Sequence, residues 1–200
     1  MKNYIILFFF IASFPLFSQD AEALFSSIEL ETDSKPELLP KQMIFTQRLL
    51  WGEQGLMRKT HWSPLTLEQR EKELKIRRKM LKTHQVIGFV TLAGMVAQGV
   101  LGTQLYNGKS SNYEVHETLG NLTSVSYFTG AALSLFAPPP LIQKKSKGLS
   151  STQAHKYLAP LHFSAMLATN LLAESDTKLH RAAAFTAFGS YAAAILVFKF

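Results

Sequence analysis

The sequence predicts an all-α membrane protein, a bundle of four transmembrane helices preceded by a signal peptide and a short extramembrane segment. Charge is segregated along the chain: residues 20–82 contain ten acids and twelve bases, whereas Glu114 and Glu117 are the only acids between residues 83 and 173. The second region contains four apolar runs long enough to cross a bilayer, and a shorter apolar run stands at the N-terminus. These observations separate an aqueous part of the chain from a membrane part.

Residues 1–19 are predicted to be a secretory signal peptide. One lysine precedes an apolar core from Ile5 to Phe17, which is shorter than the ~20 residues of a spanning helix, and small and polar residues follow it. A signal cut near Ser18 or Ala21 is favoured over an uncleaved anchor.

Residues 20–82 are expected to form the extramembrane segment. Residues 43–55 have the pattern of a short amphipathic helix lying on the bilayer. A second helix is predicted to begin either at Ser63 with Pro64 or at Thr66, where Gln69 completes a capping box. It should run directly into the first span as a basic juxtamembrane helix. Its charges are expected to be solvated and without a partner: Arg70, Lys72, Lys75, Arg77, Arg78, Lys79 and Lys82.

Residues 83–200 are expected to form the four-helix membrane domain. Helices of the predicted lengths extend ~27–35 Å, enough to cross a bilayer. Asn107-Gly108 ends the first span and the prolines at 138–140 end the second. Glycine, alanine, serine and threonine are frequent, which favours close packing of the helices. The spans are predicted at residues 84–106, 115–137, 155–173 and 180–198.

Each span begins with a histidine that is followed four residues later by glycine or alanine. Residues i and i+4 share a helix face, so each helix presents an imidazole near its membrane entrance and bare backbone one turn deeper. Because consecutive spans run in opposite directions, the first and third histidines lie at one membrane face and the other two at the opposite face. The four are His84 with Gly88, His116 with Gly120, His155 with Ala159 and His180 with Ala184.

Two imidazoles that face each other across a bundle core are what bis-histidine haem ligation requires, and small residues let a flat porphyrin approach the helix. His84, His116, His155 and His180 are therefore the predicted iron ligands. Zinc or non-haem iron is disfavoured, because the imidazoles are divided between two faces and no carboxylate accompanies them. The chain has no cysteine, which excludes disulfides, zinc–thiolate sites, iron–sulfur clusters and thioether-linked haem.

The remaining histidines and two methionines are less favoured as iron ligands. His162 competes with His155, because it lies seven residues further along the same helix face. His155 is favoured, since its greater separation from His180 accommodates two cofactors near opposite faces. His61 is assigned to the surface, and Met95 and Met166 are assigned to core packing.

These residues resemble the cytochrome b561 family of transmembrane dihaem b-type cytochromes. Over residues 83–198, His84-Gln-Val-Ile-Gly with Gln98 and Gly102 is similar to one of the family's helices, and His116-Glu-Thr-Leu-Gly is similar to another. The chain would be a core four-helix version. The resemblance implies two non-covalent haem b groups, paired first-to-third and second-to-fourth, and transmembrane electron transfer.

Two other functions remain open: the cytochrome b subunit of a larger quinone-linked oxidoreductase, and a non-redox four-helix membrane protein. The expected partners are the lipid bilayer and an electron donor and acceptor, with quinol or a small reductant as candidates; a homodimer is also open. The net charge of +7 is attributed to the membrane surface, and no nucleic-acid partner is expected.

The predicted location is the inner (cytoplasmic) membrane, as a multi-pass protein, but two rules disagree on its orientation. A cleaved signal exports residues 20–82 and places His84 and His155 at the outer face. Counted from Arg58 onward, lysine and arginine are distributed fourteen to three between the two sides, and the positive-inside rule gives the opposite orientation. The exported N-terminal segment is favoured, because long segments can be translocated despite their charge.

Overall fold

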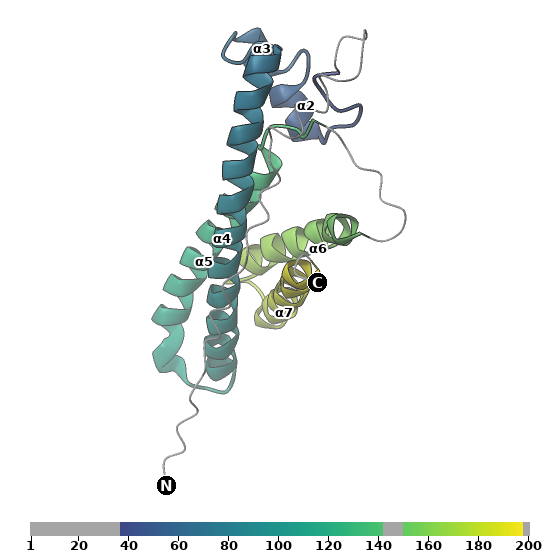
Figure 1. The fold of residues 1–200 in the computed structure, drawn as a ribbon. Coiled ribbons are helices and arrows are strands. Elements are labelled where there is room, and N and C mark those ends of the chain that lie inside the picture. Colours follow the sequence, from purple (N-terminus) through teal and green to yellow (C-terminus); the bar gives the residue numbers. More distant parts are fainter. Residues whose placement is uncertain (1–36, 142–149, 198–200) are drawn as a thin grey trace. The chain divides into compact units, whose positions relative to one another are not determined.

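The computed structural model describes residues 37–141 and 150–197. The predicted signal peptide, residues 20–36 and the three lysines between residues 144 and 147 lie outside the described residues. Within the described ranges the protein is helical and contains no strand, so the all-α prediction is confirmed. The elements in chain order are α2 (Phe45–Trp51), α3 (Leu56–Lys59), α4 (Leu67–Tyr106), the 3-10 helix η1 (Ser110–Asn112), α5 (Tyr113–Leu135), α6 (Ser151–Leu171) and α7 (Thr177–Leu196) (Figure 1).

Helix α4 joins the basic segment to the first predicted span in one uninterrupted helix of 40 residues. It begins at Thr66, whose side chain accepts a hydrogen bond from the Gln69 amide at 3.3 Å, so the start at Thr66 is correct and the start at Ser63 is wrong. The helix ends at Tyr106, before Gly108 with its φ of 88°. The predicted division between residues 82 and 83 therefore falls inside a continuous helix.

The other three long helices begin and end close to the predicted limits. Helix α6 begins four residues earlier than expected, because Ser150 and Gln153 form a capping box. Helix α7 begins after Asp176, whose carboxylate accepts the amides of Lys178 and Leu179 at 2.9 Å. A carboxylate at this position also interacts favourably with the helix dipole.

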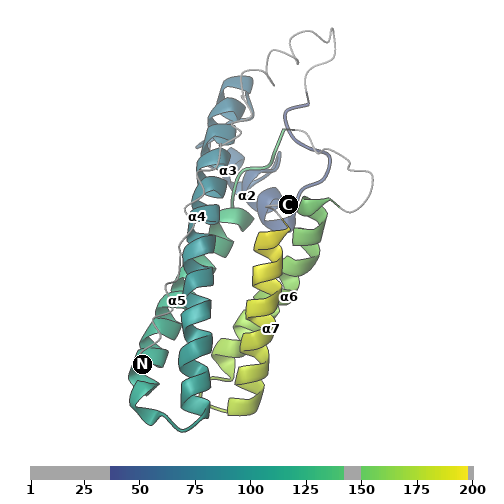
Figure 2. The same cartoon turned by 60° about the horizontal axis from the view of Figure 1, so that its bottom comes forward.

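The four long helices form two antiparallel pairs, α4 with α5 and α6 with α7, which Figure 2 shows in green-blue and green-yellow. Helix α4 also contacts α7. The core between the pairs is built from Met95, Tyr127, Ala165, Met166, Ala187 and Tyr191.

Large apolar side chains remain exposed on the outer faces of these helices. Among the described residues, α4 is the one helix whose length and composition suffice to cross a membrane. Exposed apolar side chains also occur on α5, α6 and α7, where Val125, Leu171 and Phe185 have 66%, 80% and 50% of their surface accessible. Exposed large apolar side chains thus occur on all four long helices.

Residues 37–66 pack against the first half of α4 through a buried ionic cluster. Arg58 and Arg70 both form ion pairs with Glu73, whose side chain is fully buried. Arg58 Nη2 also donates to the Trp51 carbonyl at 3.2 Å. The short helix α2, predicted within residues 43–55, is held by this cluster.

The same half of α4 binds the chain that follows α5. Arg70 donates from Nη2 to the Pro139 carbonyl at 3.0 Å, and Arg77 donates from Nη1 to the Pro138 carbonyl at 2.7 Å. Trp51 Nε1 donates to the Phe136 carbonyl at 2.9 Å. The expectation that the bases of this helix are solvated and lack partners is therefore wrong for Arg70 and Arg77. Sequence alone does not reveal that the carbonyls of a proline-rich turn come within reach of them.

We predict that Glu73→Gln destabilises this N-terminal region by about 3–5 kcal/mol, because it leaves two guanidinium groups buried without a counter-charge. The chain has two tryptophans, so a Trp62→Phe background leaves the buried Trp51 as the sole fluorescent reporter. Denaturant titration of the purified full chain followed by Trp51 emission measures the change.

Glu68→Gln is the matched control, since Glu68 contacts only Lys72 at 2.7 Å on the exposed face of the same helix. It should leave the unfolding transition unchanged.

Burial by itself raises the pKa of Glu73, but hydrogen bonds from Arg58, Ser63 and Arg70 outweigh burial and hold the pKa below its ordinary value of 4.5. The contribution of Glu73 to the free energy of unfolding is therefore complete above pH 4.5. It is lost as the pH falls through the pKa that Glu73 has in the folded protein, which is lower. Equal effects of the two substitutions would show that the cluster does not stabilise this region.

Candidate functional site

The four histidines singled out from the sequence lie in two pairs. The imidazole rings of His84 on α4 and His155 on α6 have centroids 6.5 Å apart and planes at 81°. The rings of His116 on α5 and His180 on α7 have centroids 6.3 Å apart and planes at 78°. Each pair thus joins one helix of the first antiparallel pair to one helix of the second.

Backbone carbonyls orient one histidine of each pair. His84 Nδ1 lies 2.8 Å from the Gly130 carbonyl oxygen, and His180 Nδ1 lies 2.8 Å from the Thr169 carbonyl oxygen. A carbonyl can only accept, so Nδ1 carries the proton in both rings. In the neutral ring Nε2 is then left with a free lone pair, which is the form in which histidine binds a metal.

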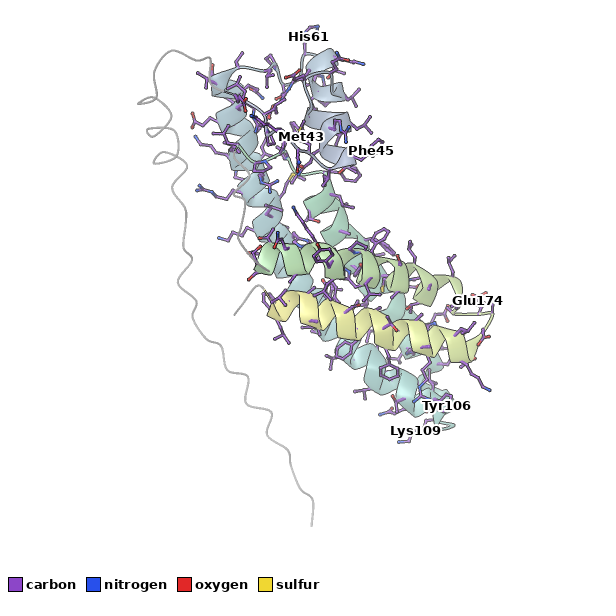
Figure 3. The ribbon with its side chains drawn as sticks, turned by 90° about the vertical axis from the view of Figure 1, so that its right-hand side faces the viewer. Met43, Phe45, His61, Tyr106, Lys109 and Glu174 are labelled. Carbon is purple, nitrogen blue, oxygen red and sulfur yellow. The ribbon has the colours of Figure 1, made fainter. Side chains whose placement is uncertain are left out.

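The distance between the two histidine pairs can be counted along helix α5 and along helix α6, and the two counts agree. Gly130, which contacts His84, lies 14 residues along α5 from His116. Thr169, which contacts His180, lies 14 residues along α6 from His155. At ~1.5 Å per residue each separation is ~21 Å. Figure 3 shows His61 toward one end of the long helices and Tyr106, Lys109 and Glu174 toward the other.

The dimensions of both pairs fit axial ligation of one metal ion by two imidazoles. A metal–imidazole nitrogen bond is about 2.0–2.1 Å long, so rings bound on opposite sides of one ion have centroids about 6.4 Å apart. His116 also has a buried Nδ1 with no hydrogen-bond partner among the described residues. No group of three or more histidine, cysteine or acidic side chains that could hold a metal occurs in the described ranges. Two ligands per site suit a metal whose other positions are filled by a macrocycle.

Two glycines lie against these rings, but they differ from those expected. A Cβ on Gly102 would lie 3.1 Å from His116 Cε1, and a Cβ on Gly130 would lie 3.8 Å from His84 Nδ1. The expected positions one turn beyond the histidines meet polar side chains instead. A Cβ on Gly88 would lie 3.5 Å from the Tyr191 hydroxyl, and a Cβ on Gly120 would lie 3.5 Å from Gln98 Nε2.

His162 lies in the helix core beside the ring of His155, two turns further along α6. The Tyr127 hydroxyl is 2.6 Å from its Nδ1, and the Tyr191 ring centroid is 5.2 Å from that of its ring. The His162 ring is 6.2 Å from His155, and its Nε2 is buried without a hydrogen-bond partner among the described residues. The structure therefore brings His155, and not His162, opposite His84.

The remaining candidates occupy the positions expected of them. His61 is exposed, with a φ of 58° in a tight turn. Met95 and Met166 are buried in the core cluster. Sequence reasoning did not find the carbonyls of Gly130 and Thr169 or the contact between Tyr127 and His162. Every residue has a carbonyl, so no residue type identifies those two acceptors, whereas a tyrosine and a second histidine within apolar helices were visible signals.

Comparison of the chain with protein-family models, curated proteins and solved structures finds no match in any of the three.

We predict that Tyr127→Phe lowers the thermal unfolding midpoint of the full chain in detergent, because it leaves a second nitrogen of buried His162 unpaired. The loss of one such partner costs about 1–3 kcal/mol. Combining Tyr127→Phe with His162→Leu removes both polar groups and should recover most of the loss. A single variant as stable as the unmodified chain would contradict a structural role for this contact.

Proposed function

We propose that residues 83–200 form a four-span membrane domain that binds two haem b groups and carries electrons between them. His84 and His155 hold one haem, and His116 and His180 hold the other. Bound haem supplies reversible one-electron chemistry at its iron. The observation that carries this proposal is the pair of neighbouring imidazoles at each site, with ring centroids 6.5 and 6.3 Å apart.

The hydrogen bonds behind the rings support ligation. A carbonyl that accepts from Nδ1 fixes the orientation of the ring and raises the basicity of Nε2. His84 and His180 both have such a carbonyl at 2.8 Å. Without cysteine the attachment is non-covalent. The chain's own contribution is to hold and tune the group, with no bond-making step.

The distribution of charge and exposure supports four membrane crossings by α4, α5, α6 and α7. The sequence has no acidic or basic residue, histidine aside, in 118–141, 157–173 or 182–198. The apolar side chains exposed on these helices, such as Leu122 at 63% and Leu196 at 56%, then face lipid. We therefore propose that the chain is a multi-pass protein of the inner membrane. A core four-helix relative of the cytochrome b561 family is the class that combines these features.

Electrons enter at one membrane face and leave at the other. The ~21 Å helical separation supports one haem near each face. The core between them contains Tyr127, His162 and Tyr191, together with Met95 and Met166.

We predict that His84→Ala and His155→Ala each remove one haem, and that His116→Ala and His180→Ala each remove the other. Haem per chain in the purified protein, from its b-type absorption and protein mass, is the measurement. His162→Ala serves as the matched control, because it also removes a buried imidazole from α6. Loss of a haem in His162→Ala, with two retained in His155→Ala, would move the ligand assignment to His162.

The predicted orientation exports residues 20–82 and places His84 and His155 at the outer face. Helix α4 then runs inward and Phe200 faces outward. A reporter active only outside the cytoplasm, fused after Phe200, should be active, and the same reporter within the α4–α5 connection at Lys109 should be inactive. The reverse result would invert the protein and exchange the faces of the two haem sites.

A further inference from the structure

Arg77 is a partly buried cation for which the described residues supply no counter-charge. The guanidinium groups of Arg58 and Arg70 both form ion pairs with the buried carboxylate of Glu73. Arg77 has no ion pair among the described residues, and the Pro138 carbonyl, at 2.7 Å from Nη1, is a neutral acceptor.

The groups around Arg77 disfavour its positive charge. Burial, followed by the positive charge of Arg70, lowers the pKa of Arg77 below its ordinary value. A peptide carbonyl contributes a dipole and uses one of the five N–H donors of the guanidinium. A partly buried guanidinium beside a second positive charge favours binding of an anion.

The position of Arg77 on α4 indicates which anion it can reach. It lies seven residues before His84 on the same uninterrupted helix. Seven residues are two turns, so the two side chains share a face and are separated by ~10.5 Å along the axis. Arg77 lies on the side of His84 toward the extramembrane segment. Lys79, two residues further on, is exposed on another face.

We propose that the Arg77 guanidinium binds a propionate carboxylate of the haem held by His84 and His155. This inference rests on the proposed haem-binding function. A guanidinium matches a carboxylate with two parallel hydrogen bonds, and the bond to Pro138 holds it in place. The phosphate of a lipid headgroup offers the same oxyanion chemistry, so the test must separate the two sources.

Esterification of the haem carboxylates, which removes their negative charge, distinguishes a haem propionate from a lipid phosphate. A His180→Ala background leaves the His84/His155 site alone. The full chain, stripped of haem in detergent, is titrated with iron protoporphyrin IX and with its dimethyl ester. Arg77→Gln should weaken binding of the free acid by roughly 10- to 100-fold and leave binding of the diester unchanged. Arg77→Lys should recover part of the affinity, and Lys79→Gln should behave as the unmodified protein.

Other outcomes overturn the inference. Equal weakening for both haems would assign Arg77 to the fold of the site. An unchanged affinity for the free acid, with loss of a co-purified anionic phospholipid, would assign it to a lipid headgroup. If the unmodified background binds neither haem, the proposed function fails and the inference fails with it. If that background binds both and Arg77→Gln changes neither, only the inference fails.

Discussion

Two backbone hydrogen bonds, from His84 to the Gly130 carbonyl and from His180 to the Thr169 carbonyl, fix the rings on which the site depends. Each bond crosses between two helices of one antiparallel pair. The register of α5 against α4 therefore sets the direction of His84, and the register of α7 against α6 sets that of His180. The partner rings of His155 and His116 come from the opposite pairs, so the site exists only when all four helices are packed together.

Residues 37–66 and the first half of α4 help to set the same helix register. Glu73 joins residues 37–66 to α4, while Arg70 and Arg77 join α4 to the chain that follows α5. This fixes the end of α5 from which Gly130 is five residues distant. A buried ion cluster adds little to stability relative to apolar packing, but losing one partner is costly. Such a cluster is therefore suited to holding α4 and α5 in one register.

The sequence predicted much of the fold, because helix ends depend on local signals: the Thr66 cap, Gly108 and the prolines at 138–140 stop or start helices with few long-range contacts. Helical periodicity also identified the four histidines that the structure brings into pairs. It failed where an acceptor had no distinctive side chain, as at Gly130 and Thr169. It failed again for Arg70 and Arg77, which look like surface charges until the proline turn is placed beside them. The small residues one turn beyond each histidine were identified, but Gly88 and Gly120 face Tyr191 and Gln98.

The central claim is that each histidine pair holds one haem. The most direct measurement is the reduced-minus-oxidised spectrum of the purified full chain, combined with its haem content by pyridine extraction. Two haem b groups per chain, with low-spin bands characteristic of two imidazole ligands, is the predicted result. A chain that folds and inserts but contains no haem, before or after addition of excess haem, would contradict it.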